Sequence, residues 1–166
     1  MLTAALERVA SRSDLSSAEA TAAIAEIMAG RASEIEIAGL LMALRTKGVT
    51  PTELAGFVSA MRSAAVPVES GGKPLVDTAG TGGGATTFNI STAAALIAAA
   101  AGAKVAKHGN RSSTSRSGSA DVLETLGVRI DLGPEAEARL INELGFGFMF
   151  APLHHSGMRH AVPVRK

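Results

Sequence analysis

The chain has 166 residues, of which 46% are apolar and 3% aromatic, and it contains no Trp, Tyr or Cys. Sixteen basic against fifteen acidic side chains give a formal charge of +1. This balance lacks the basic excess of a dedicated nucleic-acid-binding protein, and the absence of Cys excludes disulfides and thiolate metal sites. No basic-then-apolar signal segment stands at Met1, and the apolar stretch 93–103 is too short for a membrane span. We therefore expect a cytoplasmic protein that binds neither nucleic acid nor membrane.

Residues 1–65 are predicted to form successive amphipathic helices. Three segments start with a capping box, in which a hydroxyl residue is followed three positions later by Glu: Ser16 with Glu19, Ser33 with Glu36, and Thr50 with Glu53. Gly30 and Gly48 mark helix ends. Each segment has apolar side chains at helical spacing, the last being Leu54, Phe57, Val58 and Met61. These faces must pack against each other or against a partner chain.

A linker is predicted at 66–74, where Pro67, Gly71 and Gly72 break the helical pattern and could form a hinge. Beyond it, apolar strands at 75–79, 104–107 and 146–150 alternate with helices at about 91–101, 120–126 and 134–144. This alternation is typical of a largely parallel sheet. The sequence therefore predicts an α/β protein with an all-helical lobe at 1–65 and an α/β lobe at 75–166.

The segment between Asp77 and Asp121 contains no acidic residue. Instead it is rich in Gly, Ser, Thr and Asn and carries basic residues at Lys104, Lys107 and Arg111. Glycines let backbone N–H groups approach an anion, and hydroxyls, amides and cations add hydrogen bonds and charge. This composition predicts a site for phosphates.

The glycine run 80–85 matches the dinucleotide-binding pattern G-x-G-x-x-G/A by letter. That pattern also needs an acidic residue some twenty positions later, where this chain has Lys107 and His108, so a nicotinamide-dinucleotide site is disfavoured. A P-loop is disfavoured because no Lys-Ser or Lys-Thr pair follows the glycines. A tight strand-to-helix turn remains an alternative interpretation of the run.

Two further motifs lie where ligands collect in α/β proteins. The stretch 89–92 stands at the start of a helix, where ordinary N-capping is the alternative. The stretch 107–111 follows the second strand and could clamp phosphate oxygens, while His108 alone could equally be structural or catalytic. The Ser-rich run 112–119 precedes a helix and fits either a second phosphate cradle or a flexible linker.

Near the end of the chain, basic residues cluster at His154, His155, Arg159, His160 and Arg165. A zinc site is disfavoured, since no acidic residue or Cys accompanies these histidines and adjacent residues seldom converge on one ion. Arg165 is better suited to anchoring a carboxylate.

Taken together, the motifs resemble the anthranilate phosphoribosyltransferase family, which acts in tryptophan biosynthesis. They are GTGG at 80–83, NIST at 89–92, KHGNR at 107–111, SGSADVLE at 117–124, FMFAPLHH at 148–155 and HAVPVR at 160–165. The resemblance covers the whole chain. It implies a nucleoside-phosphorylase- and phosphoribosyltransferase-like fold, a homodimer formed through the N-terminal helices, and Mg²⁺-dependent transfer of phosphoribose from phosphoribosyl pyrophosphate to anthranilate.

The resemblance also implies roles for individual residues. Gly80, Asn110 and Arg165 would bind anthranilate, and Ser91 would contact Mg²⁺. The residues that would bind phosphoribosyl pyrophosphate are Gly80, Thr81, Gly82, Gly83, Gly84, Thr87, Asn89, Ile90, Ser91, Thr92, Lys107, His108, Gly109, Asn110, Arg111, Ser112, Ser113, Thr114, Ser115 and Ser119. No covalent nucleophile is expected, because the protein positions the substrates and stabilises the leaving pyrophosphate.

The chain departs from the family in two respects. Gly84 stands where the family usually has Asp, and members are roughly twice as long, with an Asp-Glu pair for Mg²⁺ in their second half. We therefore expect the 166 residues alone to be inactive or nearly so. The alternatives are an enzyme like pyrimidine nucleoside phosphorylase and a non-catalytic relative that binds nucleic acid, which the near-zero charge disfavours.

Overall fold

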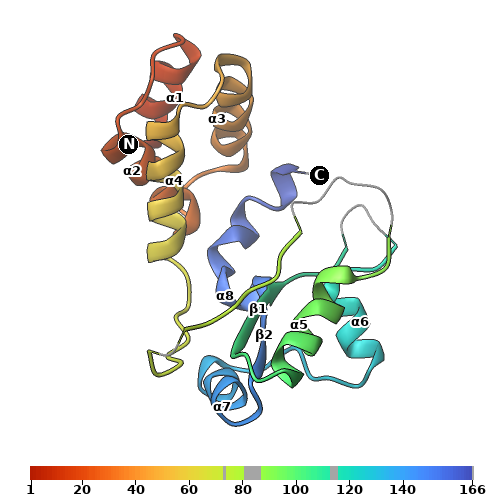
Figure 1. Ribbon diagram of the computed structural model, residues 1–166. Helices are drawn as coiled ribbons and strands as arrows, with labels where there is room; N and C mark the ends of the chain where they lie inside the picture. The colour runs from red at the N-terminus through yellow and green to blue at the C-terminus, as the bar shows by residue number, and fades with distance from the viewer. Residues whose placement is uncertain (73, 81–86, 113–115, 166) are drawn as a thin grey trace. The chain divides into compact units, whose positions relative to one another are not determined.

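The computed structural model describes residues 1–72, 74–80, 87–112 and 116–165. The chain folds as two compact units (Figure 1). One unit is helical and combines Met1–Ala65 with His155–Lys166, and the other is Val66–His154. No helix of the described residues is long and apolar enough to cross a membrane.

Four helices form most of the helical unit: α1 (Leu2–Ala10), α2 (Ser17–Met28), α3 (Glu34–Lys47) and α4 (Pro51–Ser63). The three predicted capping boxes are confirmed at the starts of α2, α3 and α4, each with both reciprocal hydrogen bonds. Gly30 and Gly48 follow α2 and α3 with φ of 70° and 90°, a region that favours Gly. Local sequence signals therefore set the helix boundaries.

The end of the chain completes the helical unit. The short helix η1 (Ser156–His160) packs on α2, and η2 (Pro163–Arg165) packs on α3. Gly157 permits the first contact, because a Cβ there would lie 2.6 Å from the Met28 carbonyl oxygen. Ala161 joins the same apolar core as Ile27, Ile37 and Leu40. The compact units thus differ from the predicted division, which assigned residues 155–166 to the α/β lobe.

Helix α4 buries a different face from the predicted one. Its buried residues are Glu53, Gly56 and Ala60, whereas Leu54 and Val58 are exposed. Gly56 allows the close approach of α4 to α2, since a Cβ would lie 2.5 Å from the Ser17 carbonyl oxygen. Small residues therefore form this helix contact, and of the two predicted alternatives Leu54 and Val58 leave open only packing against a partner chain.

Glu53 is a fully buried carboxylate with many donors around it. It accepts hydrogen bonds from the backbone N–H groups of Leu15 (2.9 Å) and Thr50 (2.8 Å) and from the Thr50 hydroxyl. The Lys47 ammonium lies 3.0 Å away and also pairs with Asp14 at 2.7 Å. Burial raises the pKa of Glu53, but these donors outweigh it and lower the pKa to about 2. The carboxylate therefore joins the loop before α2 to the start of α4.

The α/β unit is built on two parallel strands, β1 (Val105–Gly109) and β2 (Phe146–Phe150). The register pairs Val105 with Phe146 and Gly109 with Phe150. Helices α5 (Ile90–Ala100), α6 (Ser119–Thr125) and α7 (Pro134–Leu144) precede or connect the strands, and α8 (Ala151–His154) follows β2 (Figure 1). The predicted parallel pairing and the three predicted helices are confirmed, with ends shifted by a residue or so.

The predicted strand at 75–79 is reduced to a single bridge between Val76 and Val105. After Val76, the backbone groups that would continue the strand pairing form hydrogen bonds with side chains instead. The Asp77 carboxylate accepts from the His108 N–H (3.3 Å) and the Thr78 N–H (2.7 Å), and the Lys107 ammonium donates to the Thr78 carbonyl. The segment therefore leaves the sheet edge one residue after pairing begins.

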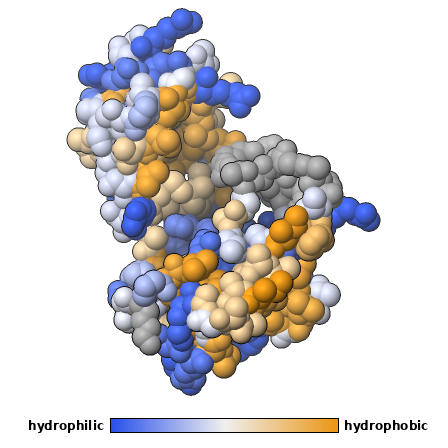
Figure 2. Space-filling model, viewed as in Figure 1, coloured by the Kyte–Doolittle hydropathy of each residue, from blue (hydrophilic) through white to orange (hydrophobic). Residues whose placement is uncertain are grey.

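The apolar core of the α/β unit is small. It contains Ala120, Leu123, Ile130 and Phe148. Helix α5 keeps an exposed apolar face that includes Ile90, Leu96 and Ile97, and Figure 2 shows hydrophobic surface over this helix. Parallel sheets are normally covered on both faces, so an exposed helix of this composition indicates a surface that another polypeptide can cover.

Candidate functional site

The middle residue of β1 carries a buried cation. Lys107 is 1% exposed, and its ammonium donates to the Thr78 carbonyl and lies 3.4 Å from the hydroxyl oxygens of both Thr78 and Ser91. The Thr78 hydroxyl in turn donates to the Ser91 carbonyl at 2.7 Å. Lys107 thus joins three segments: β1, the chain after the Val76 bridge, and the first turn of α5.

Burial lowers the pKa of Lys107, and the charge of Asp77 opposes this shift. A desolvated ammonium whose partners are mostly neutral oxygens gains from any anion brought near it. The β1 end is therefore electrostatically suited to a phosphate group.

The first turn of α5 faces the same region. Asn89 precedes the helix but does not cap it, since its side-chain amide donates instead to the Ser117 carbonyl at 3.0 Å. Ordinary N-capping by Asn89, the alternative considered from the sequence, is thereby excluded. Thr92 is buried, and its hydroxyl has no hydrogen-bond partner within the described part of the chain. The N–H groups of Ile90 and Thr92 already donate to the carbonyls of Phe88 and Asn89, so the unpaired Thr92 hydroxyl is the group of this turn that can serve an anion.

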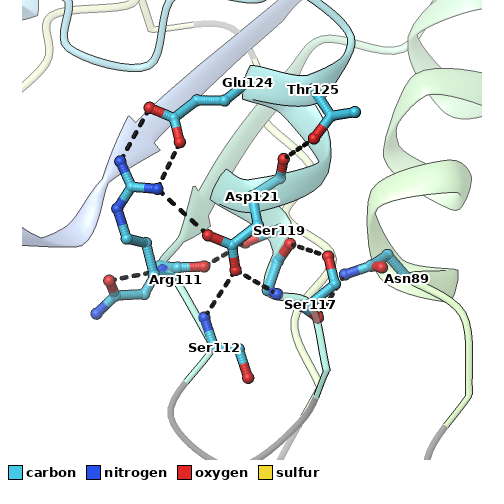
Figure 3. A network of polar contacts seen from close by, with 10 residues as sticks. Asn89, Arg111, Ser112, Ser117, Ser119, Asp121, Glu124 and Thr125 are labelled. Atoms are coloured by element: carbon cyan, nitrogen blue, oxygen red, sulfur yellow. Dashed lines mark hydrogen bonds and ion pairs between the residues drawn. The ribbon is translucent and has the colours of Figure 1, made fainter.

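Asp121 organises the loop between β1 and α6 (Figure 3). Its carboxylate accepts from the backbone N–H of Gly118 (2.7 Å) and of Ser112 (3.1 Å) and pairs with Arg111 at 3.3 Å. Glu124 on α6 also binds the Arg111 guanidinium, at 2.9 Å for one of its two contacts. These donors lower the pKa of Asp121. The Arg111 charge is therefore already balanced by two carboxylates, although the sequence suggested that it is free for phosphate.

Two glycines allow this loop to pack tightly. A Cβ on Gly118 would lie 2.4 Å from the Ser112 backbone nitrogen, and a Cβ on Gly109 would lie 2.2 Å from the Ser119 hydroxyl oxygen. The Ser119 hydroxyl also donates to the Asn110 carbonyl at 3.3 Å. The loop is thus held by backbone contacts that no larger residue permits.

The structure brings together several of the predicted phosphate-binding residues and leaves others apart. Asn89, Ser91, Thr92, Lys107 and Ser119 lie on the elements around the end of β1. Exposed positions are Gly80, Thr87, Ile90, Asn110 and Arg111, while His108, Gly109 and Ser112 are partly buried. Thr81, Gly82, Gly83, Gly84, Ser113, Thr114 and Ser115 lie outside the described residues.

The predicted anthranilate residues are divided between the two units. Gly80 and Asn110 belong to the α/β unit, and Arg165 ends η2 in the helical unit. Asn110 accepts the Arg111 N–H with its side-chain oxygen at 2.7 Å, so its amide nitrogen is the group left to face a ligand.

A magnesium site does not fit the described residues by themselves. Ser91 offers one hydroxyl oxygen, which lies 3.4 Å from the Lys107 ammonium. No group of three His, Cys, Asp or Glu side chains that could hold a metal occurs in the described ranges. Mg²⁺ prefers carboxylates and water in octahedral geometry, so further ligands have to come from outside these residues.

Sequence reasoning missed the acidic residues of the region. Asp77 and Asp121 bound the acid-free segment in sequence, but both carboxylates fold back onto it and fix its backbone. The sequence did contain a local signal for Asp121. It stands at the third position of α6, where an acid commonly accepts the N–H of the residue before the helix, here Gly118. For Asp77 no local signal existed, because its partner His108 is 31 positions away.

Comparison with known proteins matches both parts of the chain to one family. Residues 3–65 match the helical bundle domain of the glycosyl transferase family, and residues 72–166 match its a/b domain. Anthranilate phosphoribosyltransferase of Methanopyrus kandleri is 54% identical over 162 residues, which are 97% of this chain and 48% of that protein. The chain thus spans about half the length of the curated relatives it matches.

Solved structures give the same result. The crystal structure of anthranilate phosphoribosyltransferase from Thermus thermophilus matches with a TM-score of 0.90 and 48% identity, covering 97% of this chain and 49% of that one. The Saccharomyces cerevisiae enzyme in complex with PRPP and Mg matches with a TM-score of 0.88 and 29% identity, covering 99% of this chain and 50% of that one. Another structure of the yeast enzyme contains 4-fluoroanthranilate. This chain belongs to the glycosyl transferase family, and it is similar in sequence and fold to about half the length of anthranilate phosphoribosyltransferases.

Proposed function

We propose that this chain provides the phosphoribosyl pyrophosphate site of an anthranilate phosphoribosyltransferase. The observation that carries the proposal is the meeting of the buried Lys107 ammonium with the first turn of α5, which holds the Ser91 hydroxyl and a Thr92 hydroxyl that has no partner among the described residues. Ligands of open α/β sheets bind beyond the carboxyl ends of the strands, where the loop 110–112 follows β1. The relatives that match over nearly the whole chain carry this activity in their names.

Such a site needs no nucleophile of its own. In the transfer, the bond from the anomeric carbon of ribose to the pyrophosphate oxygen breaks, the anthranilate amine forms the new bond, and that amine loses a proton. Negative charge develops on the departing pyrophosphate. The Lys107 ammonium and the Thr92 hydroxyl are suited to stabilise that charge, and the Asp121-fixed loop is suited to orient the sugar.

Magnesium neutralises pyrophosphate charge when it is bound. Because the described residues do not form a site for it, we expect the ion to reach this chain with the diphosphate and to need carboxylates from a polypeptide equivalent to the second half of the relatives. We therefore expect the 166-residue chain to bind phosphoribosyl pyrophosphate weakly and to transfer nothing. The cytoplasmic location remains a prediction from the sequence.

The test separates binding from catalysis. Phosphoribosyl pyrophosphate is titrated calorimetrically, with and without Mg²⁺, into this chain and into a version extended to the length of the relatives. Loss of anthranilate fluorescence reports transfer, and phosphate-dependent cleavage of uridine is the competing activity. Thr92→Val should weaken binding about tenfold, since it removes one hydrogen bond to a charged ligand. Thr46→Val, a change on exposed α3, should leave it unchanged. Equal affinity of Thr92→Val and the parent chain would refute the site.

We also propose that the helical unit forms a homodimer through α1 and α3. Ile35 and Met42 on α3 are 84% and 60% exposed, and they are seven positions apart, so they lie on one face of the helix. A groove beside Met42 is lined by Val9, Ala10 and Ala43 of the same two helices. Exposed large apolar side chains next to an apolar groove are typical of a protein interface.

Sedimentation equilibrium tests this interface. Met42→Glu should shift the chain toward the monomer, because a charge would be buried in the dimer. Leu54→Glu, at an exposed apolar position on α4, is the matched control and should leave the dimer intact. A dimer lost in the control and kept in Met42→Glu would assign the interface to α4 instead.

A further inference from the structure

The chain passes between the helical unit and the α/β unit twice, between Ala65 and Val66 and between His154 and His155. The two crossing residues of the α/β unit bind each other. The Val66 N–H donates to the His154 carbonyl at 2.9 Å, and His154 Nδ1 lies 3.2 Å from the Val66 carbonyl oxygen. Both connections between the units are therefore tied together inside the α/β unit.

A buried acid faces the other side of the same imidazole. Glu137, on the first turn of α7, is 0% exposed, and His154 is 4% exposed. Glu137 Oε2 lies 2.8 Å from His154 Nε2. Neither oxygen of Glu137 accepts a hydrogen bond from an N–H or O–H of the described residues, so a hydrogen bond across the 2.8 Å contact requires the carboxyl itself to be the donor. The pair is thus a close contact of two ionisable groups with no other support.

The surroundings offer no other charge to this pair. Helix α7 packs on β2, whose residues Phe146–Phe150 include no titratable side chain. Lys104 binds the opposite end of α7, at the carbonyl oxygens of Ile141 and Asn142. Glu69, on the segment that begins at Val66, is exposed. Among the described residues, His154 is the group that acts on the charge of Glu137.

The tautomer of His154 follows from these contacts. Nδ1 faces a carbonyl oxygen, which can only accept, so Nδ1 carries a proton. Nε2 of a neutral ring then presents a lone pair to Glu137, and two acceptors at 2.8 Å repel each other. The contact becomes favourable when the Glu137 carboxyl carries a proton and donates it to Nε2. The contact at Val66 and the contact at Glu137 are then satisfied together.

We propose that Glu137 and His154 form a proton-dependent clamp that holds the two chain crossings of the α/β unit together. Loss of the shared proton leaves a buried carboxylate against a lone pair, which drives the ring away from Glu137 and frees Val66. The clamp is independent of the transfer activity proposed above. It gives the contact between Val66 and His154, within the α/β unit, a closed form at lower pH and a looser form at higher pH.

The direction of the titration agrees with this geometry. Burial raises the pKa of Glu137, and His154 partly offsets the shift. A carboxyl whose pKa is higher in the folded than in the unfolded chain contributes stability below its unfolded pKa and loses it as pH rises through the folded value. The clamp is therefore expected to open as pH increases.

Hydrogen exchange of the Val66 amide in the full chain tests the clamp. Exchange is followed by NMR from pH 5 to pH 9 and corrected for intrinsic rates, and the ring nitrogen shifts of His154 report its tautomer. In the parent chain, corrected exchange at Val66 should rise several-fold with pH, as the Glu137 carboxyl loses its proton. Glu137→Gln should show low exchange at every pH, because its amide can donate to Nε2 and has no proton to lose.

Glu135→Gln is the matched control, since Glu135 is exposed on the same turn of α7, and it should behave as the parent chain does. Two results would overturn the clamp. One is a flat pH profile for Val66 in the parent chain, and the other is the same pH dependence in Glu137→Gln as in the parent. Because the first needs no variant, a failure of Glu137→Gln to fold leaves the test intact.

Discussion

Replacing Glu53 by Gln exchanges one carboxylate oxygen for an amide nitrogen, and we expect this small change to destabilise the helical unit markedly. The pKa of Glu53 falls from 4.5 to about 2. At about 1.4 kcal/mol per pKa unit, this shift corresponds to about 3 kcal/mol at neutral pH. Its partner Lys47 also pairs with Asp14, which is 63% exposed, so solvent screens part of the attraction. We therefore expect a loss of about 2 kcal/mol.

The stability contributed by the Glu53 carboxylate should depend on pH in a defined direction. A carboxyl with a lowered pKa contributes stability above its unfolded value and loses it as pH falls through its folded value. The difference between the parent chain and Glu53→Gln should be complete above about pH 4.5 and should shrink toward pH 2. Hydrogen exchange of peptides from α2 and α4 measures it, because the chain has no Trp or Tyr and two units need not unfold in one step.

Glu19→Gln is the matched control, because Glu19 completes the same kind of capping box at the start of α2 but remains partly exposed. It should cost much less than Glu53→Gln. Equal losses in the two variants, or a Glu53→Gln loss that is the same at pH 3 and pH 7, would refute the argument that burial and converging donors make Glu53 special.

Three further changes test the α/β unit. Gly109→Ala places a Cβ 2.2 Å from the Ser119 hydroxyl oxygen and 2.6 Å from the Phe148 ring, so it should destabilise the unit by about 1–3 kcal/mol in a denaturant titration followed by circular dichroism. Lys107→Met leaves a buried carbonyl without its donor and should cost about 1–3 kcal/mol in the same titration, together with a loss of phosphoribosyl pyrophosphate binding. Asp121→Asn should speed amide exchange at Ser112 and Gly118 while leaving the exchange of α2 unchanged, since it removes the charged acceptor of these two N–H groups.

Features that depend on neighbours in sequence could be predicted. The capping boxes at Ser16, Ser33 and Thr50 are each closed by residues three positions apart, so four letters determine them. The parallel pairing of β1 with β2 follows from the alternation of strands and helices, which admits few arrangements. The predicted strand at 104–107 is placed too early, because β1 runs from Val105 to Gly109 and Lys107 is its middle residue.

Features that depend on distant partners could not be predicted. The small face of α4 is buried because Gly56 meets Ser17 on another helix, whereas hydrophobicity alone favours Leu54 and Val58. Glu137 and His154 are 17 positions apart, and from the sequence His154 only belongs to a basic cluster near the end of the chain. The contact between the two side chains appears only in the folded structure.

The helical unit is interrupted in sequence by the whole α/β unit, because its core takes Ala161 from beyond that insertion. Domains generally fold as the chain leaves the ribosome, amino-terminal parts first. Here the four amino-terminal helices emerge without their last core contributions and must wait until some ninety residues, 66–154, have been translated. Nascent α1–α4 is therefore expected to remain accessible to chaperones for longer than a contiguous helical bundle would. It is expected to reach its final packing only after residues 155–166 have been translated.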